Sequence, residues 1–203
     1  MLHDFAYSSA SYRVRIALNL KGLTYDSRFY VLREGQQRSP EYLAINPAGL
    51  VPTLEDNGVR ISQSLAIIEY LDQQYPDPRL IPAGGLDRIR AMELALVIAC
   101  DIHPLNNLRV LKQLEERTGM SQDGLDDWYR HWVATGFTTL EATLPDTPFA
   151  GGDRPNIADV CLVPQLFNAR RYKLDLTPYP RLVAIGDRAA ALPAFQAAAP
   201  PPR

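Results

Sequence analysis

Three hydroxyl side chains cluster near the start of the chain, at Ser8, Ser9 and Ser11. They follow a short apolar segment and open a stretch in which apolar residues recur at the spacing of one buried helical face. Serine is a preferred N-cap, and a helix start carries unpaired N–H groups at the positive end of its dipole. A serine hydroxyl held there can donate to an anion such as a thiolate and favour its charged form. The same serines could also serve only as helix caps.

The composition is that of a globular protein in water. The chain has 203 residues, 46% hydrophobic and 22% charged, and its formal net charge of −2 argues against general nucleic-acid affinity. No apolar run is long enough to cross a bilayer, and no secretory signal is visible. Its two cysteines, Cys100 and Cys161, lie far apart and outside any C-x-x-C pair. We therefore expect a cytoplasmic protein with reduced thiols that binds neither membranes nor nucleic acid.

The first part of the chain combines strands and helices. Residues 2–6 are typical of a strand, 8–18 of a helix that ends at Lys21 and Gly22, and 25–31 of a second strand. This order predicts a parallel strand pair with a right-handed crossover. Beyond it, 33–39 reads as a loop and 40–43 as a helical turn.

A hairpin and a helix follow. Asp56, Asn57 and Gly58 form a strong turn signal, which pairs residues 53–55 with 59–61 in antiparallel fashion. After the hairpin the apolar period changes from two to nearly four, which predicts a helix that starts near residues 62–64 and stops before Tyr75.

A proline-rich connector at residues 76–82 separates this region from one in which strand signals almost vanish. We expect helices over 86–114 with a bend at Pro104, over 126–144, from Asn156 with Asp159 as a capping box, and over 180–191, then a frayed tail at 197–203. The division predicted from these signals is a first domain at 1–76, a linker at 77–85 and an all-helical domain at 86–203.

Metal binding is not expected. Cys100, Asp101 and His103 are metal-ligand types, but they lack the paired Cys and His spacing of a structural zinc site. Because Cys100 falls in an apolar run, we expect it to be a buried thiol.

Several motifs resemble one family. Residues 8–18 resemble the signature S-S-C-S-W-R-V-R-I-A-L, residues 63–71 match a family helix start, and 101–107, 163–165 and 175–180 are similar to bacterial members. With these motifs the chain resembles the zeta-class glutathione transferases, the maleylacetoacetate and maleylpyruvate isomerases. The resemblance implies an α/β thioredoxin-like N-terminal domain, an all-α C-terminal domain and a homodimer.

The resemblance also implies a glutathione site. Ser8 would hydrogen-bond the glutathione sulfur and lower its thiol pKa, assisted by Ser9. The backbone of Val51, before a cis Pro52, would pair with the cysteinyl residue of the tripeptide. The remaining implied contacts are Gln63 and Ser64 to the γ-glutamyl carboxylate, and Gln37 to the glycyl end.

The implied substrate is a maleyl keto acid, a dianion with a cis double bond. Reversible thiolate addition, rotation and elimination would give the trans isomer and regenerate glutathione as a true cofactor. Arg109 and Arg171 are the candidate carboxylate ligands, because guanidinium binds carboxylate in bidentate geometry. His103 and Asn107, four residues apart on the predicted long helix, would face the same way and contact glutathione or substrate.

Two positions depart from the family pattern. Ala10 stands where many members have cysteine, and Tyr7 stands where the isomerases usually have arginine, so Tyr7 could donate a hydrogen bond to substrate but brings no charge. Two alternatives therefore stay open: a transferase or dehalogenase acting on another electrophile, and a glutathione-binding protein without turnover.

Overall fold

The computed structural model describes residues 1–201 of the chain, which form two compact units. One unit contains Met1–Ile81 together with the segment from Ala191, and the other contains Pro82–Ala190. The C-terminal segment thus groups with the first unit, whereas we expected it in a helical domain over 86–203. The division at 77–85 stays a prediction.

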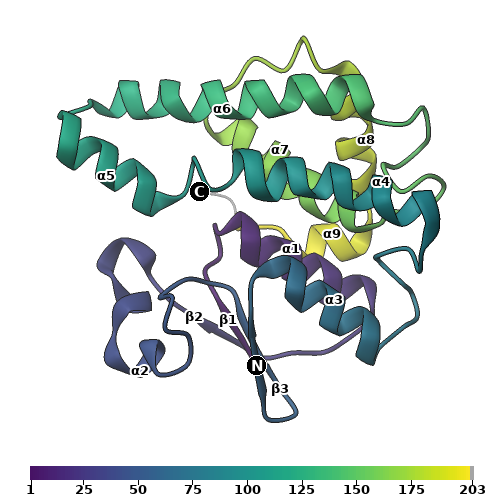
Figure 1. The fold of residues 1–203 in the computed structure, drawn as a ribbon, viewed down its shortest axis with the longest axis horizontal. Coiled ribbons are helices and arrows are strands. Elements are labelled where there is room, and N and C mark those ends of the chain that lie inside the picture. Colours follow the sequence, from purple (N-terminus) through teal and green to yellow (C-terminus); the bar gives the residue numbers. More distant parts are fainter. Residues whose placement is uncertain (202–203) are drawn as a thin grey trace. The chain divides into compact units, whose positions relative to one another are not determined.

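The first unit is built on a four-stranded sheet in the order β2-β1-β3-β4. Figure 1 labels the first three strands. The strands are β1 (Leu2–Asp4), β2 (Ser27–Phe29), β3 (Thr53–Asp56) and β4 (Val59–Ser62). β2 is parallel to β1, whereas β3 is antiparallel to both β1 and β4. The parallel pair and the hairpin at Asn57 and Gly58 are therefore confirmed.

Two helices of this unit lie side by side, α1 (Ser9–Leu20) and α3 (Ser64–Gln74) (Figure 1). The expected loop at 33–39 contains two 3₁₀ turns, η1 (Leu32–Glu34) and η2 (Gln36–Arg38), and α2 (Pro40–Leu43) forms the expected helical turn. All these elements lie within the thioredoxin-like part predicted from the sequence.

The expected frayed tail is wrong for residues 197–198, which belong to α9 (Pro193–Ala198), and α9 packs on α1. Pro202 and Arg203 lie outside the described residues. Phe195 and Ala198 are buried, and the Asn19 amide donates to the Ala194 carbonyl at 3.0 Å. Local sequence signals missed α9 because its stability comes from this tertiary packing rather than from helix propensity.

A buried ion pair joins four parts of the first unit. The Arg15 Nη1 donates to both carboxylate oxygens of Asp4, at 2.7 and 2.9 Å. Its Nη2 donates to the Ala6 carbonyl at 2.8 Å, and its Nε donates to the Ala198 carbonyl at 2.9 Å. One guanidinium group therefore connects β1, the loop after β1, α1 and α9.

The second unit contains helices: α4 (Gly85–Leu96), the π-helical segment η3 (Val97–Ile102), α5 (Leu108–Thr118), α6 (Gln122–Thr143), α7 (Ile157–Arg171) and α8 (Pro180–Ala190). The prediction of one long helix over 86–114 is wrong, because the chain leaves the helix at His103 and restarts at Leu108. Pro104 has no N–H to continue the helical ladder, and the Asn107 side chain caps a new helix by accepting from the Arg109 N–H.

Cys100 is exposed, so the expectation of a buried thiol there is wrong. The buried positions on this segment are Ile98 and Ile102, and Cys100 lies midway between them on the other side of the helix. Cys161 of α7 is buried. Within residues 1–201, no helix has the length and apolar character needed to cross a membrane.

The capping box predicted at Asn156 is confirmed at the start of α7. The buried Asp159 carboxylate accepts from three backbone N–H groups, those of Ala150, Gly151 and Asn156, at 2.8, 3.0 and 2.9 Å. Burial raises the pKa of Asp159 from 3.8 to about 6, although these hydrogen bonds favour the charged form.

Asp159 should give the protein a specific pH dependence of stability. Between pH 3.8 and about 6, the folded protein retains a proton that the unfolded chain has released, so the free energy of unfolding falls as pH rises through this window. Asp159→Asn removes this titration. The difference in free energy of unfolding, wild type minus variant, should therefore fall by about 2–3 kcal/mol from pH 4 to pH 6. Urea unfolding across this range measures the difference. A difference that stays constant with pH would contradict the assignment.

Candidate functional site

The strand directions bring the predicted cofactor-binding segments to one edge of the first unit's sheet. β1 ends at Asp4 and leads to Ser8, and parallel β2 ends at Phe29, opposite Asp4, and leads to η2 with Gln37. Because parallel strands end at the same edge, the two following loops begin on the same side of the unit.

The antiparallel strands add two more segments to this edge. β3 starts at Thr53, directly after Pro52, and Thr53 pairs with His3 near the end of β1. The last residue of β4, Ser62, also pairs with Thr53, and the chain then continues to Gln63. Four segments distant in sequence therefore meet where strands end or begin.

Ser8 is the N-cap of α1 and keeps its donor hydrogen. Its Oγ accepts from the Ser11 N–H at 3.2 Å. A serine hydroxyl has one hydrogen to donate and two lone pairs. Because the cap uses only a lone pair, the hydrogen remains available to an anion at the positive end of α1. The following residue, Ser9, is buried.

A buried hydrogen-bond network holds the segment before β3. The Tyr42 hydroxyl and the Asn46 amide both donate to the Leu50 carbonyl, at 2.6 and 2.8 Å, and both contact Thr53 Oγ1 at 3.1 Å. Burial raises the pKa of Tyr42, so its phenol stays protonated and donates. The Val51–Pro52 peptide bond that follows is cis, as the resemblance implied.

Gln37 is buried in η2, and its side-chain Oε1 has no hydrogen-bond partner among the described residues. Its backbone lies against Gly49, where an added Cβ would come within 3.1 Å of the Gln37 carbonyl oxygen. Gly49 also has a φ of 60°, which favours glycine. The close packing of this loop thus depends on Gly49, and it leaves a buried acceptor group on Gln37.

The start of α3 is open. Gln63 has a φ of 71°, unusual for a residue other than glycine, and its side chain caps none of the described N–H groups of α3. The Oγ of Ser64 accepts from the Arg13 Nη1 at 3.3 Å. An uncapped helix start with a hydroxyl and a nearby cation is suited to binding a carboxylate.

Tyr7 already has a partner in the first unit. Its hydroxyl donates to the Pro201 carbonyl at 3.2 Å, and its ring makes an edge contact with Phe5. Its role as a substrate ligand stays a prediction.

The structure does not place His103 and Asn107 on one continuous helix, so the prediction that they face the same way on it is wrong. His103 ends η3, and Asn107 is the N-cap of α5. Arg109 follows in the first turn of α5 and lines a small, mostly apolar hollow of about 370 Å³ with Val110, Gln113, Leu114, Arg117 and Thr118.

The turn at 103–107 and the end of α7 are anchored to the same part of α6. The Asn106 amide donates to the Tyr129 carbonyl at 3.3 Å, and the Tyr129 ring stacks on Tyr172 with centroids 3.6 Å apart. The Arg171 guanidinium lies over the Tyr172 ring, 4.9 Å from its centroid. In the second unit the structure thus brings Arg171 and the segment before Arg109 to adjacent positions along α6.

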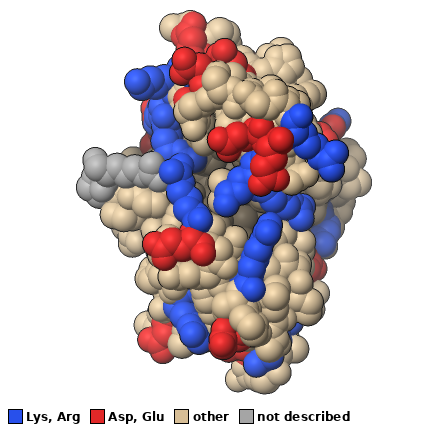
Figure 2. All heavy atoms as spheres, turned by 90° about the vertical axis from the view of Figure 1, so that its left-hand side faces the viewer, with Lys and Arg blue, Asp and Glu red and all other residues tan. Residues whose placement is uncertain are grey.

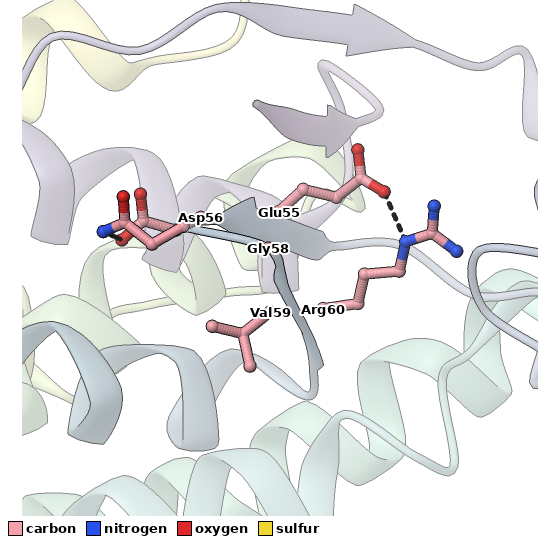
Figure 3. Close-up of a pocket in the computed structure, with 6 residues that line it drawn as sticks. Glu55, Asp56, Gly58, Val59 and Arg60 are labelled. Carbon is pink, nitrogen blue, oxygen red and sulfur yellow. Dashed lines mark hydrogen bonds and ion pairs between the residues drawn. The ribbon is translucent and has the colours of Figure 1, made fainter.

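Two other surface features do not form this site. A hollow of about 620 Å³ lies at the β3–β4 hairpin, lined by residues 55–60, where Arg60 Nε and Glu55 Oε1 pair at 2.6 Å (Figure 3). It contains none of the predicted site residues and lies at the opposite edge of the sheet from Ser8. Basic and acidic side chains are interspersed on the face drawn in Figure 2. Within residues 1–201, no group of His, Cys, Asp and Glu has metal-binding geometry.

Sequence reasoning missed Arg13, the residue that contacts Ser64. Its signal was present, because Arg13 and Arg15 are charged residues within a helix whose other central positions are apolar. Both are buried, and only the structure shows that their partners differ.

Both parts of the chain match known families. Residues 2–79 match the model described as glutathione S-transferase, N-terminal domain, and residues 123–197 match that of the C-terminal domain. The chain is 50% identical to the probable maleylacetoacetate isomerase of Vibrio cholerae over 98% of this chain and 95% of that protein.

Solved structures agree with this similarity. A holo structure of maleylpyruvate isomerase, described as a bacterial zeta-class glutathione S-transferase, is 41% identical, with a TM-score of 0.95, and the match covers 98% of this chain and 96% of that chain. A maleylacetoacetate isomerase from Methylobacterium extorquens AM1 with bound malonate and GSH is 38% identical, with a TM-score of 0.92, and the match covers 98% of this chain and 95% of that chain.

Proposed function

Because the chain belongs to the glutathione S-transferase family, we propose that it is a glutathione-dependent isomerase. It converts a maleyl keto acid, maleylacetoacetate or maleylpyruvate, to the fumaryl isomer. Ser8 carries the proposal: its hydroxyl retains a donor hydrogen at the positive end of α1, on the sheet edge to which the segments with Gln37, Pro52 and Gln63 also lead.

The residues at this edge fit the chemistry of the tripeptide. The uncapped start of α3 with Ser64 suits the γ-glutamyl carboxylate, and the backbone of Val51, next to the held Leu50 carbonyl, suits the cysteinyl residue. Gln37, whose buried Oε1 has no hydrogen-bond partner among the described residues, is suited to accept from the N–H at the glycyl end.

The chain's task in the reaction is to stabilise an anion. When bound, glutathione supplies a thiolate that adds reversibly to the cis double bond. The Ser8 hydroxyl donates to the sulfur, and the positive end of α1 adds to the stabilisation, each unit of pKa lowering corresponding to about 1.4 kcal/mol. Ser9, the first residue of the same helix, assists Ser8.

The second unit supplies the groups for a dicarboxylate. We assign Arg109 and Arg171 to its carboxylates, with His103 and Asn107 as further contacts of glutathione or substrate and Tyr7 of the first unit as a substrate contact. The support for a dicarboxylate is the malonate bound in the relative from Methylobacterium. Guanidinium suits this role because it stays charged at any physiological pH and can donate two hydrogen bonds to one carboxylate.

We also propose a homodimer located in the cytoplasm. One side of α4 exposes an apolar row, with Leu86 71%, Ile89 60% and Leu96 39% exposed, at the spacing of one helix face. A second subunit would bury this row. Both cysteines are free thiols, as is usual in a reducing compartment.

The reaction is tested by following the absorbance of maleylpyruvate and maleylacetoacetate with purified protein, with and without glutathione. We expect formation of the fumaryl isomer that strictly requires glutathione and leaves its concentration unchanged. The same preparation is assayed for halide release and aryl conjugation. Glutathione binding without isomerisation, together with either of these activities, would establish the transferase or dehalogenase instead.

Ser8→Ala separates the chemical role of Ser8 from its cap. The variant should lose about 1 kcal/mol of stability with the cap and turn over at least about 100-fold more slowly, while glutathione affinity stays largely unchanged. Ser121→Ala is the matched control, because Ser121 caps α6 in the same way by accepting from the Gly124 N–H at 3.3 Å. It should lose similar stability and keep full turnover. Equal turnover of Ser8→Ala and wild type at saturating glutathione would remove Ser8 from the chemistry.

Replacing the two arginines tests the carboxylate assignment. Arg171→Met and Arg109→Met should each lower kcat/KM for the maleyl substrate by about 10- to 100-fold, the value of a charge-assisted hydrogen bond. Arg170→Met serves as control, since this neighbour pairs with Asp187 at 2.7 and 2.9 Å. If Arg109→Met and Arg171→Met have the same kcat/KM as the control Arg170→Met, Arg109 and Arg171 are not substrate ligands.

A further inference from the structure

Arg13 is a buried cation with too few partners. It is only 2% exposed, and its Nη1 donates to Ser64 Oγ at 3.3 Å. Its Nε and Nη2 are buried without a hydrogen-bond partner, and no carboxylate within residues 1–201 forms an ion pair with it. Arg15, two residues later on the same helix, donates from Nε to Ala198, from Nη1 to Asp4 and from Nη2 to Ala6.

This difference argues against a purely structural role for Arg13. Burying a charge without a counter-charge costs several kcal/mol, whereas an apolar side chain of similar size would pack there at no such cost. Arg15 compensates for its burial with hydrogen bonds that join β1, α1 and α9, whereas Arg13 makes one hydrogen bond among the described residues, to a hydroxyl. The protein retains a cation that destabilises it, which is typical of a functional position.

The location of Arg13 indicates what its charge serves. α1 and α3 lie side by side (Figure 1), and Arg13 reaches the first residue of α3. There the positive end of the α3 dipole adds to the guanidinium charge, and Gln63 provides no side-chain cap within the described chain. This positive region needs an anion for balance.

The contact also orients the Ser64 hydroxyl. Ser64 Oγ accepts from Arg13, so the single hydroxyl hydrogen of Ser64 must point to another acceptor. Since Arg13 Nε and Nη2 are enclosed by protein, the guanidinium acts through Ser64 rather than by forked contact with a ligand.

We propose that Arg13 is a positioning residue for glutathione, which orients Ser64 as a donor and supplies the positive charge that holds the γ-glutamyl carboxylate at the start of α3. This inference rests on the proposed use of glutathione and goes beyond it by assigning affinity for one end of the tripeptide to a residue that does not touch it. The charge of Arg13 therefore affects binding of the γ-glutamyl carboxylate and not of the thiol.

The test compares glutathione with an analogue that lacks only this carboxylate, 4-aminobutanoyl-cysteinylglycine. Isothermal titration calorimetry should show that wild type binds the analogue about 10- to 100-fold more weakly than glutathione. Arg13→Met should bind glutathione at least about 10-fold more weakly than wild type and distinguish the two ligands by less than about 3-fold. Arg13→Lys, which keeps the charge, should recover part of the discrimination.

Urea unfolding and a control variant distinguish a role of Arg13 in ligand binding from a role in stability. Arg13→Met should unfold in urea at the same midpoint as the wild type or a higher one, because it removes an unpaired buried charge. Arg60→Met removes the same charge at the opposite edge of the sheet, where Arg60 pairs with Glu55 (Figure 3), and should keep wild-type discrimination. Should Arg13→Met fail to fold, the structural role is established and the proposal is overturned unless Arg13→Lys shows intermediate discrimination.

Other outcomes separate the two proposals. If Arg13→Met distinguishes the two ligands as well as wild type does, the positioning role is refuted while the proposed isomerase stands. If wild type binds glutathione with the expected discrimination but does not isomerise a maleyl keto acid, the reaction is refuted and the role of Arg13 stands. If wild type does not bind glutathione, both are overturned.

Discussion

The buried pair of Arg15 and Asp4 is the constraint on which the first unit depends. Removing either partner would leave a charge without solvent or counter-charge, a loss of about 3–5 kcal/mol in typical cases. The same guanidinium holds the Ala6 carbonyl, two residues before Ser8, and the Ala198 carbonyl of α9. The loop that presents Ser8 is therefore fixed at one end by an ion pair and at the other by the start of α1. This rigidity suits a hydroxyl that must meet a sulfur in one geometry.

Two arginines on one helix have the same guanidinium group but different roles, one in the fold and one in ligand binding. Arg15 has hydrogen-bond partners at all three nitrogens and holds the fold together. Arg13 donates to one hydroxyl, and its other two nitrogens have no partner in the part of the chain that the structure describes, so we infer that its charge is kept for a ligand. The sheet topology supports this division, because the strands bring Ser8, Pro52 and Gln63 to the edge at which α1 and α3 begin. The opposite edge, at the β3–β4 hairpin, carries the surface ion pair of Arg60 and Glu55.

Sequence alone predicted what local chemistry determines. Asn57 and Gly58 set the hairpin, Ser8 and Asn156 capped their helices, and the motifs around Ser8 and Gln63 identified the family. It failed where distant residues decide the outcome. α9 forms because Phe195 is buried, and the predicted long helix breaks because Asn107 starts a new one. The different partners of Arg13 and Arg15 could not be read from their spacing, since both depend on residues more than forty positions away or on a neighbouring strand. The ligands of the site stay predictions.

In the proposed function, Ser8 and the start of α1 bind glutathione as its thiolate. The direct measurement is a pH titration of the ultraviolet thiolate absorbance of glutathione bound to the wild-type protein, compared with free glutathione under the same conditions. We predict an apparent thiol pKa for the bound tripeptide at least about one unit below that of the free thiol, which lies near 8.5 for an unperturbed cysteine. An unchanged pKa in fully bound glutathione would contradict the account, because neither the Ser8 hydroxyl nor the helix start would then be stabilising the sulfur anion.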